Sequence, residues 1–390
     1  MALSRTILIR TGIATLVATL VLSGSLPTAD PHVYSAATAA DLDPLDIDAQ
    51  SLARSSGESF ATAAARLHQQ QAGNTLLEKL RVAAGERYAG GWLAKTGTAQ
   101  LYLRLTGAQH APIVDQLIAA SDLRVNTTYG AASSLDQRVH FADSTVFNNW
   151  VSKQSNIQGS SVDEMTDSIV MDTLATTEIP AEVLSAARAA GVEIKQRIVK
   201  ERAGDTNRGG RNMSGCTSGF VFSNGGPNQL VLAAHCSYQD YYFFNGDGPF
   251  ATSYTGQVYN QTADLQWRQP VSHTAQGTFY ADITTGDGRN QAGQSFGSLN
   301  SYVCRRGMSS GYDCGHIDST TYKPLWSGAC PGGACNSTFA RVDIGTVGGD
   351  SGGPWFSGNF AYGIQKGGST LYAVYSKLGY LPAGLNIVVP

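Results

Sequence analysis

Apolar and polar residues follow two different patterns along this chain, one before about residue 200 and one after it. In the first part, apolar side chains recur every three or four residues, which is the spacing of one helix face. This spacing predicts helices over residues 59–86, 111–120 and 180–190. Pro180 at the start of the last segment and Gly191 just after it are typical of a helix start and a helix end.

Strand-like segments lie between and after these helices. Residues 88–105 predict two strands that turn at Gly97, because leucines alternate with polar residues in the second half. A further strand is expected over residues 192–195. The mixture predicts an α/β domain over residues 41–200. The basic, polar tract 195–211 is expected to be exposed and without regular structure, as a processing linker would be.

The second part of the chain contains short apolar runs interrupted by Gly, Asn and Asp. These runs are residues 219–222, 230–234, 241–244, 360–364 and 371–375. Many short strands with frequent turn signals predict an all-β barrel or sandwich. We therefore expect a second, all-β domain over residues 201–390.

Residues 1–40 have the layout of a secretory signal peptide. Arg5 and Arg10 accompany an apolar run over residues 12–22, which is followed by small residues. The run is too short for a permanent membrane span, although a retained anchor is the alternative interpretation. Cleavage is expected between about residues 29 and 40, and the product is expected to be secreted without a stable membrane anchor.

Composition adds limits on partners and compartment. The chain has 390 residues with 27 Lys and Arg, 30 Asp and Glu, and a formal charge of -3, so no basic excess indicates nucleic-acid binding. Charged residues make up only 15% and there are 44 glycines, which favours a loop-rich β protein. All six cysteines follow residue 215, and none has zinc-knuckle spacing, so disulfides formed in an oxidising compartment are expected. No metal or cofactor is indicated, and we expect a monomer.

The candidate chemistry centres on Ser351 in the segment Gly348-Gly349-Asp350-Ser351-Gly352-Gly353-Pro354. A serine hydroxyl is a weak nucleophile and needs an adjacent base. His235, in Ala233-Ala234-His235-Cys236, is the candidate base. These two segments together resemble the chymotrypsin-fold serine proteases, and most of all their secreted bacterial branch, the alpha-lytic protease and streptogrisin group.

The resemblance covers roughly residues 213–390 and implies two packed six-stranded antiparallel barrels with the active site between them. The segment Tyr88-Ala89-Gly90-Gly91-Trp92-Leu93 is similar to the pro-regions of the same group. Residues 41–200 would then be a pro-domain that assists folding, inhibits the enzyme and is removed. A permanent accessory domain is the alternative. The mature chain is expected to begin between about 196 and 212.

The resemblance also assigns roles to the candidate residues. His235 is the general base and then the general acid, Ser351 attacks the scissile carbonyl, and the N–H groups of Gly349 and Ser351 form the oxyanion hole. Asp264 is the preferred partner of His235, with Asp282 in reserve. Other carboxylates between His235 and Ser351 are Asp240, Asp247, Asp287, Asp313, Asp318 and Asp343.

Several supporting features follow from the resemblance. Arg305 is expected to pair with Asp350. Gly345 and Thr346 lie at the base of the specificity pocket, and Gly367 and Gly368 lie on the strand that binds the substrate backbone. The expected disulfides are Cys216–Cys236 and Cys304–Cys314, which leaves Cys330 and Cys335 for each other.

The sequence departs from the family pattern at two positions. Val347 stands where a cysteine usually braces the pocket, and Lys366 stands where a serine usually touches the triad acid. The second departure makes the surroundings of Asp264 an open question. No acid occupies the Gly345 position, so we expect a preference for uncharged, apolar residues before the scissile bond.

The expected function is that of a secreted serine endopeptidase, made as a proenzyme, that acts on proteins or peptides. Its own pro-domain is the expected partner. Two alternatives are an inactive homologue that serves as a binding module, and a secreted esterase that uses the same triad.

Overall fold

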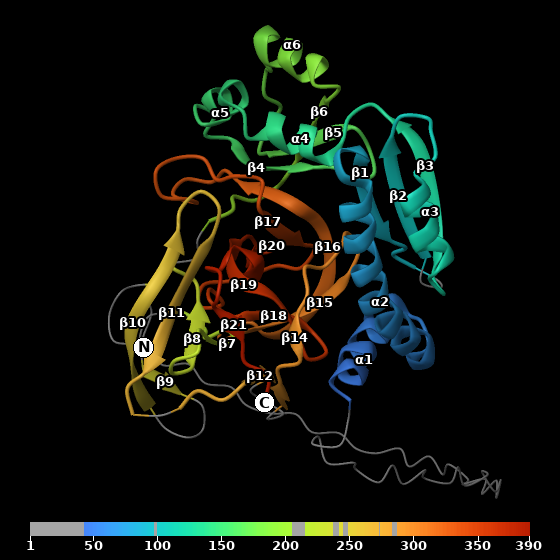
Figure 1. Ribbon diagram of the computed structural model, residues 1–390. Coiled ribbons are helices and arrows are strands. Elements are labelled where there is room, and N and C mark those ends of the chain that lie inside the picture. The colour runs from blue at the N-terminus through green and yellow to red at the C-terminus, as the bar shows by residue number, and fades with distance from the viewer. Residues whose placement is uncertain are drawn as a thin grey trace, which may run out of the picture. The chain divides into compact units, whose positions relative to one another are not determined.

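The computed structural model describes residues 43–96, 100–204, 215–236, 242–244, 249–272, 274–282 and 287–390 (Figure 1). The expected signal peptide, the turn at Gly97 and residues 205–211 of the expected processing linker lie outside these ranges. No helix within the ranges is both long and apolar enough to cross a membrane.

The region before residue 205 combines helices and strands. The helices are α1 (Pro44–Ser56), α2 (Phe60–Ala84), α3 (Pro112–Ala119), α4 (Leu135–Ala142), α5 (Thr145–Val151) and α6 (Ala181–Ala189), with a short 3₁₀ turn η1 (Gly85–Arg87). The strands are β1 (Tyr88–Leu93), β2 (Gln100–Thr106), β3 (Arg124–Ala131), β4 (Ile157–Val162), β5 (Ser168–Thr173) and β6 (Glu193–Ile198).

Local sequence signals explain where these helices begin and end. The Ser59 hydroxyl accepts a hydrogen bond from the Thr62 N–H and so satisfies an otherwise unpaired donor at the start of α2. Gly191 follows α6 with φ of 67°, a left-handed conformation that suits glycine. Leucines from α2 pack with Leu101, Leu103 and Leu105 of β2 in one buried cluster. The sheet order is β1-β2-β3.

The region after residue 214 is built from strands. They are β7 (Val221–Ser223), β8 (Gln229–Leu232), β9 (Tyr242–Phe244), β10 (Pro249–Tyr259), β11 (Asp264–Pro270), β12 (Thr278–Asp282), β13 (Asp287–Asn290), β14 (Gly293–Gln294), β15 (Tyr302–Gly307), β16 (Gly311–Pro324), β17 (Phe339–Val342), β18 (Pro354–Ser357), β19 (Phe360–Gly368), β20 (Ala373–Lys377) and β21 (Asn386–Ile387), with a 3₁₀ turn η2 (Leu378–Tyr380).

These strands form two main antiparallel groups. Six of them make a sheet in the order β21-β7-β8-β11-β10-β9. Six others close on themselves in the order β15-β18-β19-β20-β17-β16, because β16 also pairs with β15. Closure leaves no free edge among these pairings. The fold is therefore an all-β, chymotrypsin-like domain preceded by an α/β region.

Strand pairing joins the two regions. β4 pairs antiparallel with β16, so β4, β5 and β6 extend the sheet of the closed barrel. Figure 1 shows these green strands beside the orange β16 and β17. Helix α1 also contributes Leu45, Ala49 and Leu52 to a core cluster that contains residues of β7, β8 and β11.

The structure corrects part of the sequence interpretation. The tract 195–211 is not without regular structure throughout, because β6 continues to Ile198 and Arg197 pairs with buried Asp172 at 2.6 Å. The parallel partner β5 supplies the hydrogen-bonding edge that the basic residues alone do not reveal. The three expected disulfides are confirmed: Cys216–Cys236, Cys304–Cys314 and Cys330–Cys335.

Candidate active site

His235 and Asp264 meet at the ends of two paired strands. His235 follows β8, and Asp264 is the first residue of β11, which pairs with β8. The Asp264 Oδ2 atom lies 2.6 Å from His235 Nδ1, and Oδ1 accepts the His235 backbone N–H at 2.8 Å. These two contacts fix the ring relative to the carboxylate. The Cys216–Cys236 disulfide holds the turn on its far side.

This pair is almost completely buried. The side chain of His235 is 4% exposed and that of Asp264 is 1% exposed. Burial alone would raise the pKa of Asp264, but the charges of His235 and Lys366 outweigh it and hold the pKa well below its ordinary value. Asp264 therefore stays ionised over the pH range in which a histidine titrates.

Ser351 lies in a tight turn between β17 and β18 that only glycines can complete. Gly349 and Gly352 have φ of 103° and 86°, a region that other residues rarely adopt. A Cβ atom on Gly352 would lie 2.2 Å from the Thr217 carbonyl oxygen and 3.3 Å from the Ala233 backbone nitrogen. The turn thus packs directly against the segment that leads to His235.

The backbone around Ser351 is held through its carbonyl groups. The Thr217 N–H donates to the Ser351 carbonyl and the Thr217 hydroxyl donates to the Gly349 carbonyl, both at 2.7 Å. Among the residues that the structure describes, the N–H groups of Gly349 and Ser351 donate to no protein acceptor. Two such donors beside a nucleophile are able to bind a developing oxyanion.

Asp350 is anchored behind this turn by a buried ion pair. Arg305 donates to Asp350 Oδ2 at 2.8 Å, and the Ser310 hydroxyl donates to the same oxygen at 2.7 Å. The predicted Arg305–Asp350 pair is therefore present. Burial raises the pKa of Asp350, but Arg305 and the hydrogen bonds lower it by more, so it lies below the ordinary value. Val347 adds a backbone N–H at 3.1 Å.

Lys366 is a member of the site that sequence reasoning noted only as a departure. Its Nζ atom lies 2.9 Å from Asp264 Oδ2, and its side chain is fully buried. Its backbone carbonyl accepts the Ser351 hydroxyl at 3.2 Å. Lys366 thus contacts the acid through its side chain and the serine through its main chain. The sequence signal was a lysine at the position where the resembled family usually has a serine.

The strand that carries Lys366 ends at a backbone pairing with the preceding region. Gly204 and Gly368 exchange two hydrogen bonds, at 3.0 and 3.2 Å, in an antiparallel bridge. The Gly367 carbonyl accepts from Gln365 at 3.0 Å. Gly204 lies inside the window of about 196–212 in which the mature chain is expected to begin, so the main-chain groups of Gly368 expected to bind substrate are paired with the segment where cleavage is expected.

The expected pocket base is tied to its neighbours. The Thr346 N–H donates to the Ser369 carbonyl at 2.7 Å, and Arg305 donates to the Gly345 carbonyl at 2.7 Å. Thr346 is 3% exposed. Gly345 and Thr346, the expected pocket base, are both neutral.

Asp264 is the carboxylate that contacts His235 Nδ1 within the described part of the chain. Asp318 pairs with Arg341 and Asp343 with Lys95, while Asp282 ends β12. Asp240 and Asp247 lie outside the described residues, as does the side chain of Asp287.

No protein-family model matches the chain. Among solved structures, the chain is similar to Thermobifida fusca Protease A at 23% identity and a TM-score of 0.38, over 45% of this chain and 92% of that one. It is similar to the Nocardiopsis Protease at 25% identity and a TM-score of 0.35, over 43% and 88%.

A third similar structure is the alpha-lytic protease homolog N4, at 22% identity and a TM-score of 0.36, over 44% of this chain and 92% of that one. The strand order described above is that of the chymotrypsin-like fold.

Proposed function

We propose that the protein is a serine endopeptidase that forms an acyl-enzyme on Ser351. The observation that carries the proposal is the buried contact between His235 Nδ1 and ionised Asp264 at 2.6 Å, beside a serine turn with two available N–H donors. This contact fixes the ring tautomer that leaves Nε2 as the base.

In the proposed reaction, Ser351 Oγ forms a bond to the scissile carbonyl carbon while its proton passes to His235. The carbonyl oxygen becomes an oxyanion, which the N–H groups of Gly349 and Ser351 stabilise. The tetrahedral species then collapses, the C–N bond breaks, and His235 returns the proton to the leaving amine. Water, activated in the same way, releases the acid and restores the serine hydroxyl.

The same chain is proposed to be made as a proenzyme. The Gly204–Gly368 bridge favours this, because an added antiparallel strand is how a peptide binds along a sheet edge. A substrate that needs the main-chain groups of Gly368 competes with Gly204. Residues 41–200 would then act as the pro-domain, and the mature chain would begin between about 196 and 212. Gly204 lies within that window and would leave Gly368 on maturation.

Two finer assignments complete the proposal. We infer a preference for uncharged, apolar residues before the scissile bond, since the expected pocket base is Gly345 and Thr346. We also infer secretion, since three disulfides require an oxidising compartment and residues 1–40 have a signal-peptide layout.

Covalent labelling tests the nucleophile. The enzyme obtained by expressing the full chain is treated with a fluorophosphonate probe, beside His235→Ala and Ser351→Ala variants. We expect labelling at Ser351 in the parent and about 10³-fold slower labelling or none in the two variants. Ser223→Ala removes an exposed hydroxyl away from the site and is the matched control.

Substrate comparison tests the reaction class. Peptide substrates with an apolar, an acidic or a basic residue before the scissile bond are compared with simple esters. Cleavage of the apolar peptide supports an endopeptidase, and turnover of esters alone would indicate an esterase. Absence of both labelling and turnover would indicate a binding module and contradict the proposal.

A further inference from the structure

Lys366 places a second cation on the carboxylate that orients the candidate base. Asp264 Oδ2 contacts His235 Nδ1 at 2.6 Å and Lys366 Nζ at 2.9 Å. Since both nitrogens bind one oxygen, they lie within about 6 Å of each other, a range in which like charges oppose each other's protonation. The carboxylate charge is therefore shared between two partners.

The contact between Lys366 and Asp264 is buried, so the lysine charge acts strongly on its neighbours. Lys366 is 0% exposed and Asp264 1%, so water screens the interaction little. The Lys366 ammonium also lies 5.7 Å from the centre of the Phe339 ring, whose face attracts a cation. The ammonium is thus held between a carboxylate and an aromatic ring.

Charge balance gives the functional consequence. With neutral His235, the Asp264 and Lys366 charges cancel. When His235 takes up a proton, the buried group carries a net positive charge. In a site with Asp264 alone, the same protonation would produce a neutral pair. Lys366 therefore disfavours protonation of the resting imidazole.

We propose that Lys366 is a positioning residue of the triad, whose fixed charge keeps His235 unprotonated, and so competent as a base, to a lower pH than Asp264 alone would allow. This inference rests on the proposed function for its kinetic consequence. The sharing of Asp264 Oδ2 between two cations is independent of that function.

The neighbours that β20 and β17 place against Asp264 and Lys366 are neutral. Within the described ranges, β20 contributes the neutral Ser376, whose hydroxyl accepts the Asp264 N–H at 3.1 Å. β17 contributes the Phe339 ring. The nearby ion pair of Arg305 and Asp350 is internally balanced and lies behind the serine turn.

The kinetic test follows kcat/KM against pH for enzyme obtained from the full chain. The acidic limb of this profile reports protonation of the free base. Lys366→Met removes the charge and keeps much of the side-chain length, and Lys366→Ser removes both. We expect the acidic limb to move up by about one to two pH units in both variants. Lys366→Arg keeps the charge and should keep the limb within a few tenths of a unit of the parent.

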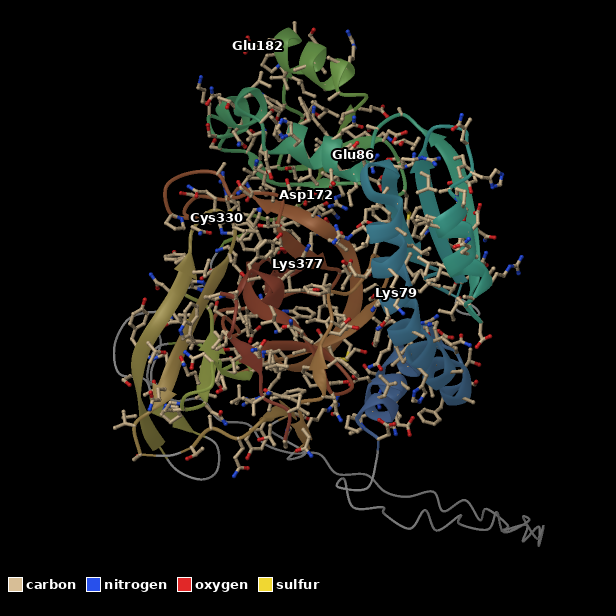
Figure 2. The ribbon with its side chains drawn as sticks, in the orientation of Figure 1. Lys79, Glu86, Asp172, Glu182, Cys330 and Lys377 are labelled. Atoms are coloured by element: carbon tan, nitrogen blue, oxygen red, sulfur yellow. A yellow bond between two sulfur atoms is a disulfide. The ribbon has the colours of Figure 1, made fainter. Side chains whose placement is uncertain are left out.

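The matched control is Lys377→Met. Lys377 is the last residue of the neighbouring strand β20, opposite Gly363 of β19, and is labelled in Figure 2. Removing this lysine should leave the acidic limb in place, because its charge does not contact Asp264.

A second measurement does not need turnover. In full-chain protein carrying Ser351→Ala, the His235 ring nitrogens are followed by NMR against pH and assigned with His235→Ala. Adding Lys366→Met should raise the titration midpoint of His235 by the same one to two units. If the parent turns over no substrate, the proposed function fails while this titration still tests Lys366.

The result that would overturn the inference is a purely structural effect. In that case kcat/KM of both neutral variants falls by a similar factor at every pH, and neither the limb nor the NMR midpoint moves. A limb that moves equally in Lys366→Arg would also contradict it, because that variant retains the positive charge.

Discussion

The region from Asp43 to Gly204 and the region from Gly215 to Pro390 are held together by different means. The first contains no cysteine, whereas the second is crossed by three disulfides. The contacts that join the regions include strand pairing of β4 with β16, buried ion pairs and the apolar cluster that α1 shares with the later strands. Non-covalent contacts can be undone and remade, so this design suits a first region that leaves and a second that persists.

Buried acids also differ between the junction and the site. Burial raises the pKa values of Asp48 and Asp172, which reach across the junction, above the ordinary value. The pKa values of Asp264 and Asp350 in the site are lowered, because nearby cations outweigh the burial. The two carboxyl groups of the site are therefore stabilised in their ionised form. Burial opposes ionisation of the two carboxyl groups at the junction.

The largest expected effect is a loss of activity, and it tests whether the proposed catalytic residues lie in the second region alone. Ser351→Ala should reduce kcat/KM by about 10⁴-fold or more, because the nucleophile and base act as one unit. If cleavage near Gly204 depends on this serine, mass spectrometry should also find the chain uncut at that point. Substitution of exposed Ser223 should change neither result.

The next effect concerns the junction itself. Asp172 on β5 is fully buried, and it contacts Arg197 from the first region and Arg341 from the second. Figure 2 labels Asp172 where the green and orange strands meet. Asp172→Ala should lower the free energy of unfolding by about 3 kcal/mol, because buried charge loses its partner. Urea unfolding of full-chain Ser351→Ala protein measures this.

Asp115→Ala is the control for that measurement. Its side chain is 44% exposed and faces His110, so the loss should stay below about 0.5 kcal/mol. Equal effects of the two substitutions would contradict the view that buried ion pairs fasten the junction.

The disulfides should rank by the length of chain that they enclose. Cys216 and Cys236 are 20 residues apart and Cys330 and Cys335 are 5 apart. Replacing each pair by serines should lower the free energy of unfolding by about 3 and about 2 kcal/mol respectively. The unfolded chain regains more conformational entropy when the disulfide that closes the longer loop is removed. Guanidinium unfolding of the two double variants tests the order. A larger loss at the shorter loop would exclude this chain-entropy explanation.

The smallest expected effect is the pH dependence of stability. The pKa of Asp350 is lowered in the fold, so its contribution is present above about pH 4 and is lost as pH falls through the folded pKa. Asp350→Asn should be less stable at neutral pH and show a flatter acid decline. The pKa of Asp48 is raised, so its contribution decreases as pH rises above about 4, and Asp48→Asn should remove that decrease.

Thermal unfolding at several pH values measures how the stability of the parent and of the two variants changes with pH. Parallel curves for the parent and both variants would mean that neither carboxyl changes its pKa on folding.

Much of the local structure could be predicted from the sequence because its signals are local. The helix expected over residues 59–86 is α2, the one over 111–120 is α3, and the one over 180–190 is α6. Their caps and apolar faces lie within each segment. Helix α1 was not predicted, since its buried face is completed only by residues of the later region. The strands β3, β4 and β5 were also missed. β4 pairs with its neighbour β5, but its other partner is the distant β16.

The candidate site divides in the same way. A short motif drew attention to Ser351 and His235, and the structure places His235 on Asp264; their catalytic roles stay predictions. The contact of Lys366 with Asp264 could not be predicted, because it joins positions that are far apart in the chain. The Gly204–Gly368 bridge likewise depends on two glycines with no side chain to signal their pairing.

Helix α1 covers a buried arginine of the second region. Its Asp48 carboxylate covers Arg289, and both side chains are fully buried. If α1 departs with the first region, the Arg289 guanidinium, which lies 4.9 Å from the centre of the Phe356 ring, becomes exposed on the remaining β domain. Such a surface attracts acidic detergents and amphipathic peptides, so purification additives of that kind would compete for the vacated place.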